Sequence, residues 1–238
     1  MRLLSDFELA SLNAARRTWA QRENVQQTGC NFHRQNNYWK QIHGLPAVRE
    51  RYTVDAAYAV AVRLPAMLAY VPPDHTVEVF DELAVYYEQA YPELDPLIFY
   101  IEEWYIGRRL RRGPGRQRPT YPVEFWNLYE AALNGQPRTT NELEGYHHHM
   151  QSFLGHHHPN PWTLLEWIKK EVVRSHQLII QLTAGQPVRR QQPAWKAREE
   201  RFRRLAERWD PALIRPIVAE DDPLLVYLRS FAHADPIV

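Results

Sequence analysis

The sequence contains a single cysteine, Cys30, among 238 residues. One thiol cannot form an intrachain disulfide, which favours a reducing compartment such as the nucleus or cytosol. No run of 18 apolar residues occurs, so we expect no membrane-spanning helix and no membrane partner. Residues 1–8 also lack the long apolar stretch of a signal peptide. Hydrophobic residues make up 45% of the chain, enough for a buried core.

The chain also lacks an excess of charge of either sign. Its 29 basic and 28 acidic residues leave a net charge of +1, whereas a dedicated DNA-binding module is usually strongly basic. Residues 107–118 are an exception, because they hold six arginines and no acid: Arg108, Arg109, Arg111, Arg112, Arg116 and Arg118. Two interpretations stay open, a solvated loop between helices or a loop that contacts DNA phosphates.

Near the N-terminus the pattern predicts one short parallel strand pair, at about residues 2–5 and 25–29. The segment between them has helical spacing, and Ser5 with Glu8 matches a capping box at its start. Strand, helix and strand in this order form a right-handed parallel crossover.

After His33 the periodicity indicates helices almost exclusively. We expect one helix over residues 53–70 with a kink at Pro65, and a long helix opened by Asn160 and Pro161 that continues through Leu182. The fold class is therefore mostly α, with a strand pair at the start.

Two carboxylates stand out as candidate catalytic and metal-binding residues. Asp6 directly follows the first strand, where open α/β sheets bind ligands, although an acid there also suits the first turn of a helix. Glu144 shares a helix face with His147, His148 and Gln151, and a carboxylate beside two imidazoles is good metal-site chemistry. A capping role for the acids after Asn141 is the alternative.

Cys30 and His33 form a CxxH pair. A closed zinc site needs four ligands, so two more would have to come from residues 147–149 or 156–158, which are histidine triplets. Zn²⁺ is therefore possible, and the alternative is a buried thiol beside a packed histidine.

Taken together, three strings resemble the catalytic core of Mutator-like (MULE) DNA transposases over about residues 3–210. They are Asp-Phe-Glu at 6–8, Gly-Cys-Asn-Phe-His-Arg-Gln at 29–35, and Arg-Thr-Thr-Asn-Glu-Leu-Glu-Gly-Tyr-His at 138–147. The family patterns are roughly DFE, GCxFHxxQ and RTNNxxEGWH. The sequence departs from the last at Thr140, where the family has its first Asn.

The resemblance implies a partial ribonuclease-H-like core with a helical insertion at about 34–137. It assigns Asp6 as the second and Glu144 as the third acid of a triad that binds Mg²⁺ or Mn²⁺, and Cys30 with His33 as the CxxH pair. It also implies DNA, as transposon ends, for a partner, a nuclear location and a possible homo-oligomer. We further expect a core at 1–185, and a linker with a C-terminal helical segment at 186–238.

The first acid of the triad would precede Met1 in this reading, so we expect the chain alone to be catalytically incomplete. Two alternatives remain open: a host-adopted nuclear protein that binds DNA or protein without catalysis, and a small zinc-binding protein.

Overall fold

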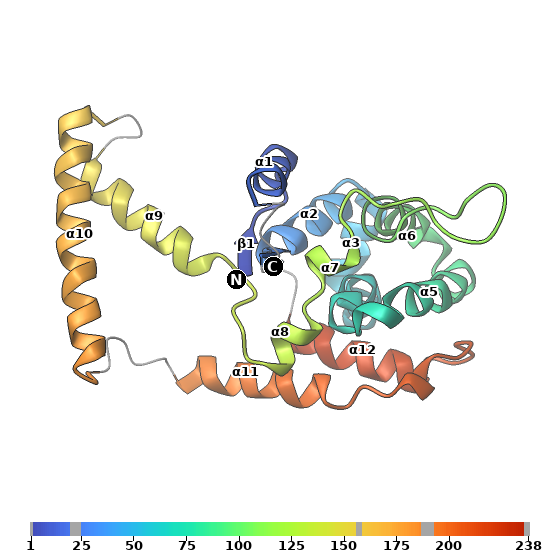
Figure 1. The fold of residues 1–238 in the computed structure, drawn as a ribbon. Coiled ribbons are helices and arrows are strands. Elements are labelled where there is room, and N and C mark those ends of the chain that lie inside the picture. The colour runs from blue at the N-terminus through green and yellow to red at the C-terminus, as the bar shows by residue number, and fades with distance from the viewer. Residues whose placement is uncertain (1, 20–24, 156–158, 187–192, 236–238) are drawn as a thin grey trace. The chain divides into compact units, whose positions relative to one another are not determined.

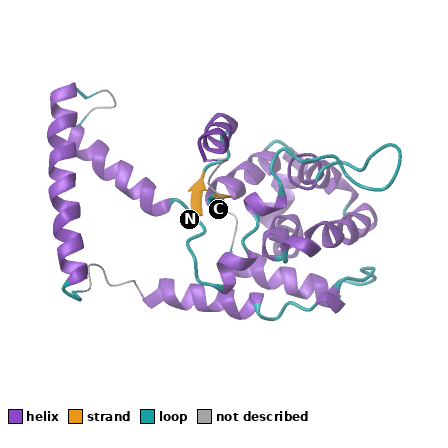
Figure 2. Cartoon of the chain, viewed as in Figure 1, coloured by secondary structure: helices purple, strands orange, loops and turns teal. Residues whose placement is uncertain are grey.

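The computed structural model describes residues 2–19, 25–155, 159–186 and 193–235, of which residues 2, 19, 141–144 and 147 are described by their backbone alone. Helices dominate, and the strands form one parallel pair (Figures 1 and 2). The expected mostly helical fold with a short strand pair is therefore confirmed. None of the described helices has the length and apolar character to cross a membrane.

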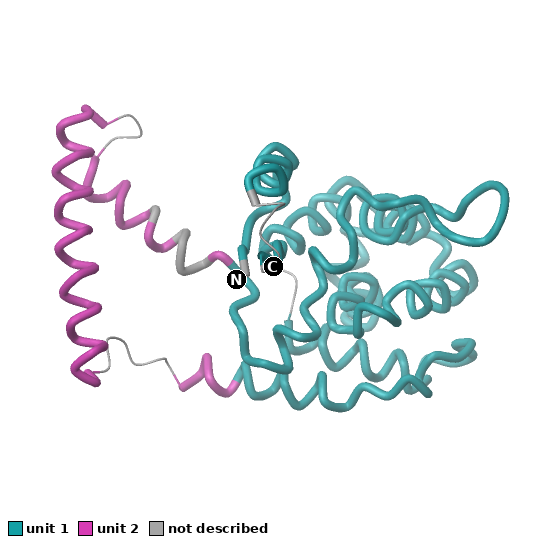
Figure 3. Tube along the Cα trace, in the orientation of Figure 1, with its two compact units in different colours: residues 1–139, 198–238 teal, residues 140–197 magenta. Residues whose placement is uncertain are grey.

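Two compact units make up the chain (Figure 3): residues 1–139 with 198–238, and residues 140–197. The first unit opens with β1 (Arg2–Ser5), α1 (Leu9–Trp19), β2 (Gln26–Gly29), α2 (Asn31–His43), α3 (Pro46–Val54) and α4 (Ala56–Arg63). It continues with the 3-10 helices η1 (Leu64–Tyr70) and η2 (Pro73–His75), then α5 (Thr76–Ala90), η3 (Pro92–Leu94), α6 (Asp95–Ile101), the π-helical turn η4 (Glu102–Ile106), α7 (Val123–Trp126) and α8 (Tyr129–Leu133).

The second unit contains α9 (Asn141–Leu154), α10 (Pro161–Thr183) and the start of α11 (Pro193–Ala206). The rest of α11, the short η5 (Pro211–Leu213) and α12 (Pro223–Ala234) belong to the first unit. This division differs from the expected boundary at 185–186. The cause is α12, whose Leu224, Leu228 and Phe231 are completely buried and pack on η1 and α4.

The strand pair is parallel, and its register places Leu3 beside Gln27 and Ser5 beside Gly29. A side chain at Gly29 would collide with Phe7 and Phe125, since a Cβ there would lie 2.7 Å and 2.9 Å from their ring atoms. Gly29 thus lets the end of the sheet approach the aromatic core closely. The helix between the strands begins at Leu9, so Ser5 ends β1 and the expected capping box does not form.

The core of the first unit surrounds η1, all seven residues of which are buried. The expected single helix over 53–70 is wrong at two points. Asp55 starts a new helix by accepting a hydrogen bond from the Tyr58 amide at 3.0 Å. Pro65 lacks an amide proton and its ring blocks the α-helical bond, so the chain tightens into a 3-10 helix from Leu64.

The expected insertion at 34–137 is not separate from the strand region, because Phe7 and Leu12 share one apolar cluster with Tyr38, Tyr70 and Phe231. In the second unit, α10 begins as expected: Asn160 accepts a hydrogen bond from the Trp162 amide at 2.9 Å and Pro161 occupies the first turn.

Candidate functional site

The three motif strings meet at the carboxyl ends of the two strands. The Cys30 amide donates to the Ser5 carbonyl at 2.7 Å, which joins the second string to the residue before Asp6. The Asn31 amide donates to the Arg138 carbonyl at 2.8 Å, which joins the second string to the third. Segments separated by more than a hundred residues along the chain are thus connected by backbone hydrogen bonds at this end of the sheet.

Asp6 is the first residue after β1 and is half-buried. Its Oδ1 accepts a weak hydrogen bond from the Glu8 amide at 3.3 Å, one residue before α1 begins. Asp6 therefore takes over the capping role that the sequence assigns to Ser5. Glu8 accepts from the Ser11 hydroxyl at 2.9 Å and is exposed, so it supports the helix start.

Phe7, between these two acids, anchors the string in the core. Its ring packs edge-on against Tyr121 and Phe125, with ring centroids 4.9 Å and 5.1 Å away. The Tyr121 hydroxyl donates to the Phe7 carbonyl at 2.9 Å. The aromatic position of the string is thus explained by packing, and Asp6 lies beside a rigid anchor.

Glu144 lies in α9, which begins three residues after Arg138. The side chains of Glu144 and His147 are outside the described residues, and Glu144 belongs to the second unit whereas Asp6 belongs to the first. Their proximity therefore stays a prediction. His148 is exposed, and its carbonyl accepts from the Ser152 hydroxyl at 2.8 Å.

Cys30 is completely buried at the start of α2, and His33 follows one turn later with its ring edge-on to Phe32 at 5.6 Å. Among the residues that the structure describes, no three His, Cys, Asp or Glu side chains lie close enough together to hold a metal ion. The burial of Cys30 favours the structural interpretation of the CxxH pair.

Sequence reasoning missed a buried carboxylate, Asp235, which binds the second string. Its Oδ2 accepts from Asn31 Nδ2 at 2.9 Å, from Gln35 Nε2 at 2.7 Å and from the Tyr70 hydroxyl at 2.7 Å. Its Oδ1 accepts from Arg198 at 2.8 Å. Four donors on one carboxylate leave little capacity for an external ligand, so Asp235 holds the fold together.

Arg34 extends this network. Its guanidinium donates to Asn31 Oδ1 at 2.7 Å and to the Ala66 carbonyl at 2.7 Å. Burial lowers the pKa of Arg34 from its usual value, with the negative charges around it, Asp235 included, acting against that. The polar residues of the GCxFHxxQ string could have indicated a buried hydrogen-bond network from the sequence alone. Their partner Asp235 could not, because it lies about 200 residues later and belongs to no motif.

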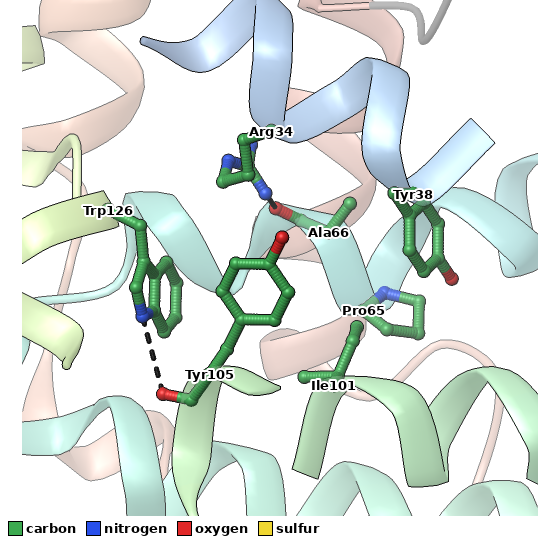
Figure 4. Close-up of a pocket in the computed structure, with 7 residues that line it drawn as sticks. All are labelled: Arg34, Tyr38, Pro65, Ala66, Ile101, Tyr105 and Trp126. Atoms are coloured by element: carbon green, nitrogen blue, oxygen red, sulfur yellow. Dashed lines mark hydrogen bonds between the residues drawn. The ribbon is translucent and has the colours of Figure 1, made fainter. Parts of the chain in front are cut away.

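A cavity of about 20 Å³ lies beside Arg34 (Figure 4). It is lined by Arg34, Tyr38, Pro65, Ala66, Ile101, Tyr105 and Trp126. A space of this size has room for about one water molecule, so it is too small for a nucleotide. The cavity is therefore a packing feature and no candidate active site.

Arg138, which opens the third string, is buried as well. Its guanidinium donates to Glu199 Oε1 at 2.7 Å and lies 4.1 Å from the centre of the Phe202 ring. Only 7% of its side chain is exposed, and its Nη1 has no hydrogen-bond partner among the described residues. This ion pair attaches the third string to α11.

No family model, curated protein or solved structure matches this chain. The site is therefore interpreted from its own geometry and from the resemblance of its three strings.

The arginine-rich segment forms a hairpin closed by an antiparallel bridge between Arg109 and Arg116. Half of its arginines are neutralised within the unit. Arg108 pairs with Glu103 at 2.9 Å, Arg109 with Asp81 at 2.8 Å, and Arg116 with Asp81 and Glu102. Arg116 is mostly buried, with 12% of its side chain exposed, and also donates to the Gly107 carbonyl.

The other three arginines, Arg111, Arg112 and Arg118, are exposed and have no ion pair with any described acid. Arg118 lines a surface groove of about 400 Å³ together with Arg16, Gln26, Gln27 and Glu124. Half of the arginines that the sequence singled out therefore have no acidic partner among the described residues.

Proposed function

We propose that this chain is the part of a Mutator-like DNA transposase catalytic region that carries the second and third acids, Asp6 and Glu144. The observation that carries the proposal is the meeting of the three strings at the carboxyl ends of a parallel strand pair, through the Cys30–Ser5 and Asn31–Arg138 hydrogen bonds. Ligands of open α/β sheets bind at this end, and Asp6 is the half-buried carboxylate that directly follows β1 there. A ribonuclease-H-like core, of which this strand pair would be a part, belongs to the same proposal.

The reaction proposed for the intact family is metal-dependent cleavage and transfer of DNA strands, and a nuclear location is part of the same proposal. Mg²⁺ or Mn²⁺ would stabilise the attacking and leaving oxygens of the phosphodiester. Asp6 offers Oδ2, which accepts no hydrogen bond from the described residues. The described residues alone do not form a three-ligand group, so we derive no catalytic step through the metal.

The chain itself supplies counterparts of two of the three acids. Two carboxylates bring a charge of −2 toward two divalent metals, which leaves too few ligands to hold both metals of the catalytic pair, although one metal can still bind between them. We therefore expect purified protein with Mg²⁺ or Mn²⁺ to show no DNA cleavage or strand transfer above background. Robust strand transfer that disappears in Asp6→Asn would show that another carboxylate supplies the first acid.

A metal-directed cutting experiment tests whether Asp6 and Glu144 share a site. Fe²⁺ bound in place of Mg²⁺, with ascorbate and peroxide, generates radicals that cut the backbone beside the metal. We expect cuts near residue 6 and near residue 144, both lost in Asp6→Asn. Asp74→Asn, which changes an exposed carboxylate in η2, is the matched control and should keep both cuts. Cuts confined to residues 147–158 and insensitive to Asp6 would instead favour the histidine-based zinc protein.

DNA binding without catalysis is the second candidate function, and the three exposed arginines of the hairpin favour it. Their replacement in Arg111→Ala/Arg112→Ala/Arg118→Ala should reduce the slope of log affinity against log salt by about 2.7, at ~0.9 per lost phosphate contact. A charge-matched control replaces three exposed arginines elsewhere in the same unit, Arg17, Arg49 and Arg208. Equal slopes for the two triple variants in fluorescence anisotropy would show that the hairpin does not contact DNA.

A further inference from the structure

The longest helix, α10, carries an apolar stripe that no described residue covers. Its 23 residues span about 34 Å. Five large aliphatic side chains lie along it: Leu165, Ile168, Val172, Ile179 and Leu182. Between 41% and 60% of each is exposed. Isolated exposed aliphatic residues are ordinary, but a continuous stripe of them marks an interaction surface.

The stripe lies on a different face from the one that α9 covers. Within the second unit, α9 contacts α10 through Tyr146 on Trp167, with ring centroids 5.6 Å apart, and through Phe153 beneath Lys170 at 4.6 Å. Trp167 lies about 115° and Lys170 about 175° around the helix from the middle of the stripe, given ~100° per residue. Packing within the unit therefore leaves the stripe available.

The spacing of the stripe is that of a coiled coil. The positions alternate steps of three and four residues over 165–182: 165, 168, 172, 175, 179 and 182. Val172 and Ile179 occupy a positions, and Ile168 and Leu182 occupy d positions. β-Branched residues at a with aliphatic residues at d favour two parallel strands. Ser175, at the remaining d position, is the one polar interruption.

Charges beside the stripe favour the same orientation. An antiparallel pair would bring Lys169 and His176 of opposite copies toward each other, whereas a parallel pair keeps these two positions apart. Glu171, at a g position, pairs within its own copy, with Arg174 at 3.3 Å and with His149 of α9 at 3.8 Å. Two copies would bury on the order of 1,000 Å² of aliphatic surface, close to the lower limit of about 1,200 Å² for stable interfaces.

We propose that this stripe is the seam of a parallel, in-register homodimer in which α10 of one copy pairs with α10 of a second copy. The proposal does not depend on the transposase function, because it rests only on the second unit. The modest interface size predicts a monomer–dimer equilibrium that shifts visibly with protein concentration.

Neighbouring valines provide a matched test, since Val172 lies in the seam and Val173 outside it, with 50% and 57% exposed. We expect Val172→Glu to weaken association at least tenfold in sedimentation equilibrium, and Val173→Glu to change it less than about twofold. Ser175→Leu fills the polar d position and should tighten association about tenfold. Circular dichroism should give equal helix content for all three, because these side chains are exposed in the monomer.

Cysteine crosslinking tests the orientation. The native thiol, Cys30, is completely buried, so Leu182→Cys introduces the accessible one. Oxidised Leu182→Cys protein should form an interchain disulfide, and mixed Leu165→Cys and Leu182→Cys proteins should not crosslink to each other. A wild-type chain that stays monomeric at every concentration, equal effects of Val172→Glu and Val173→Glu, or preferential mixed crosslinks would each overturn the proposal.

Discussion

The removal of the Asp235 carboxylate is the perturbation for which the structure makes the sharpest prediction. Asp235 ends α12, and only 4% of its side chain is exposed. It accepts hydrogen bonds from Asn31, Gln35 and Tyr70 at 2.9, 2.7 and 2.7 Å, and from Arg198 at 2.8 Å. These donors come from α2, η1 and α11, so one side chain connects four elements of the first unit.

The expected cost follows from what Asp235→Ala leaves behind. Three buried neutral donors lose their acceptor, at about 1–3 kcal/mol each before relaxation. Arg198 is half exposed, with 54% of its side chain accessible, so its guanidinium can turn to water. Removing one partner of a buried ion pair typically costs about 3–5 kcal/mol. We therefore expect Asp235→Ala to lower the free energy of unfolding by about 4–6 kcal/mol, a large share of the ~5–15 kcal/mol of a typical domain.

Asp235→Asn removes the negative charge of the side chain but keeps its shape. The carboxamide keeps one acceptor oxygen but presents an NH₂ group to donors, so we expect a loss of about 2–4 kcal/mol. Urea unfolding followed by tryptophan fluorescence measures both variants. Asp221→Ala, which removes an exposed carboxylate from the turn before α12, is the control and should stay within about 0.5 kcal/mol of wild type. A cost below about 1 kcal/mol for Asp235→Ala would refute the network as the link between these elements.

Three further perturbations have defined outcomes. Burial raises the pKa of five tyrosines well above the usual value: Tyr38, Tyr70, Tyr87, Tyr105 and Tyr227. The unfolded chain therefore ionises first, and the free energy of unfolding should fall by about 7 kcal/mol per pH unit above about pH 10, measured as urea midpoints at alkaline pH. Removing one of these groups in Tyr38→Phe should lower that slope by about 1.4 kcal/mol per pH unit, and an unchanged slope would contradict the assignment. Gly29→Ala should cost about 1–3 kcal/mol in urea unfolding, because its methyl group would overlap the Phe7 ring. Arg116→Ala should destabilise the protein by about 2–4 kcal/mol, since it leaves the half-buried Glu102 without its ion pair and Asp81 with Arg109 alone. Arg112→Ala, which changes an exposed arginine of the hairpin, should be neutral when both variants are compared by thermal unfolding.

The sequence predicted those helices and strands whose ends are determined by residues at or next to the ends themselves. The strand pair and α10 were predictable because short apolar stretches, Asn160 and Pro161 determine their positions within a few residues. The 3-10 helix η1 and the π turn η4 were not, since their tight or wide turns depend on packing at the centre of the core. The hydrogen-bond network of Asp235 could not be predicted from local sequence either, because its donors lie 37 to 204 residues away along the chain.

For the candidate site, the sequence could name chemical groups but not their surroundings. It treated the arginines of residues 108–118 as one cluster, because the acids that neutralise Arg108, Arg109 and Arg116 come partly from α5, an element about 30 residues earlier. In the second string, sequence reasoning considered only Cys30 and His33 as candidate ligands and assigned no role to Asn31 or Gln35. In the structure, Asn31 and Gln35 are occupied by Asp235.

Most residues of the motif strings hold segments of the first unit together, whereas Asp6 has a carboxylate oxygen, Oδ2, that accepts no hydrogen bond from the described residues. Phe7, Cys30, Asn31 and Arg138 are all buried, and each has packing or hydrogen-bond contacts that explain its presence without any chemistry. Asp6 differs, because the hydrogen bond that its side chain accepts from the described residues is the 3.3 Å bond from the Glu8 amide. Asparagine caps a helix start as well as aspartate does, so Asp6→Asn removes the charge while the fold keeps its contact. A loss of metal-directed cutting in that variant would therefore reflect the carboxylate itself, and not a collapse of the strand ends around it.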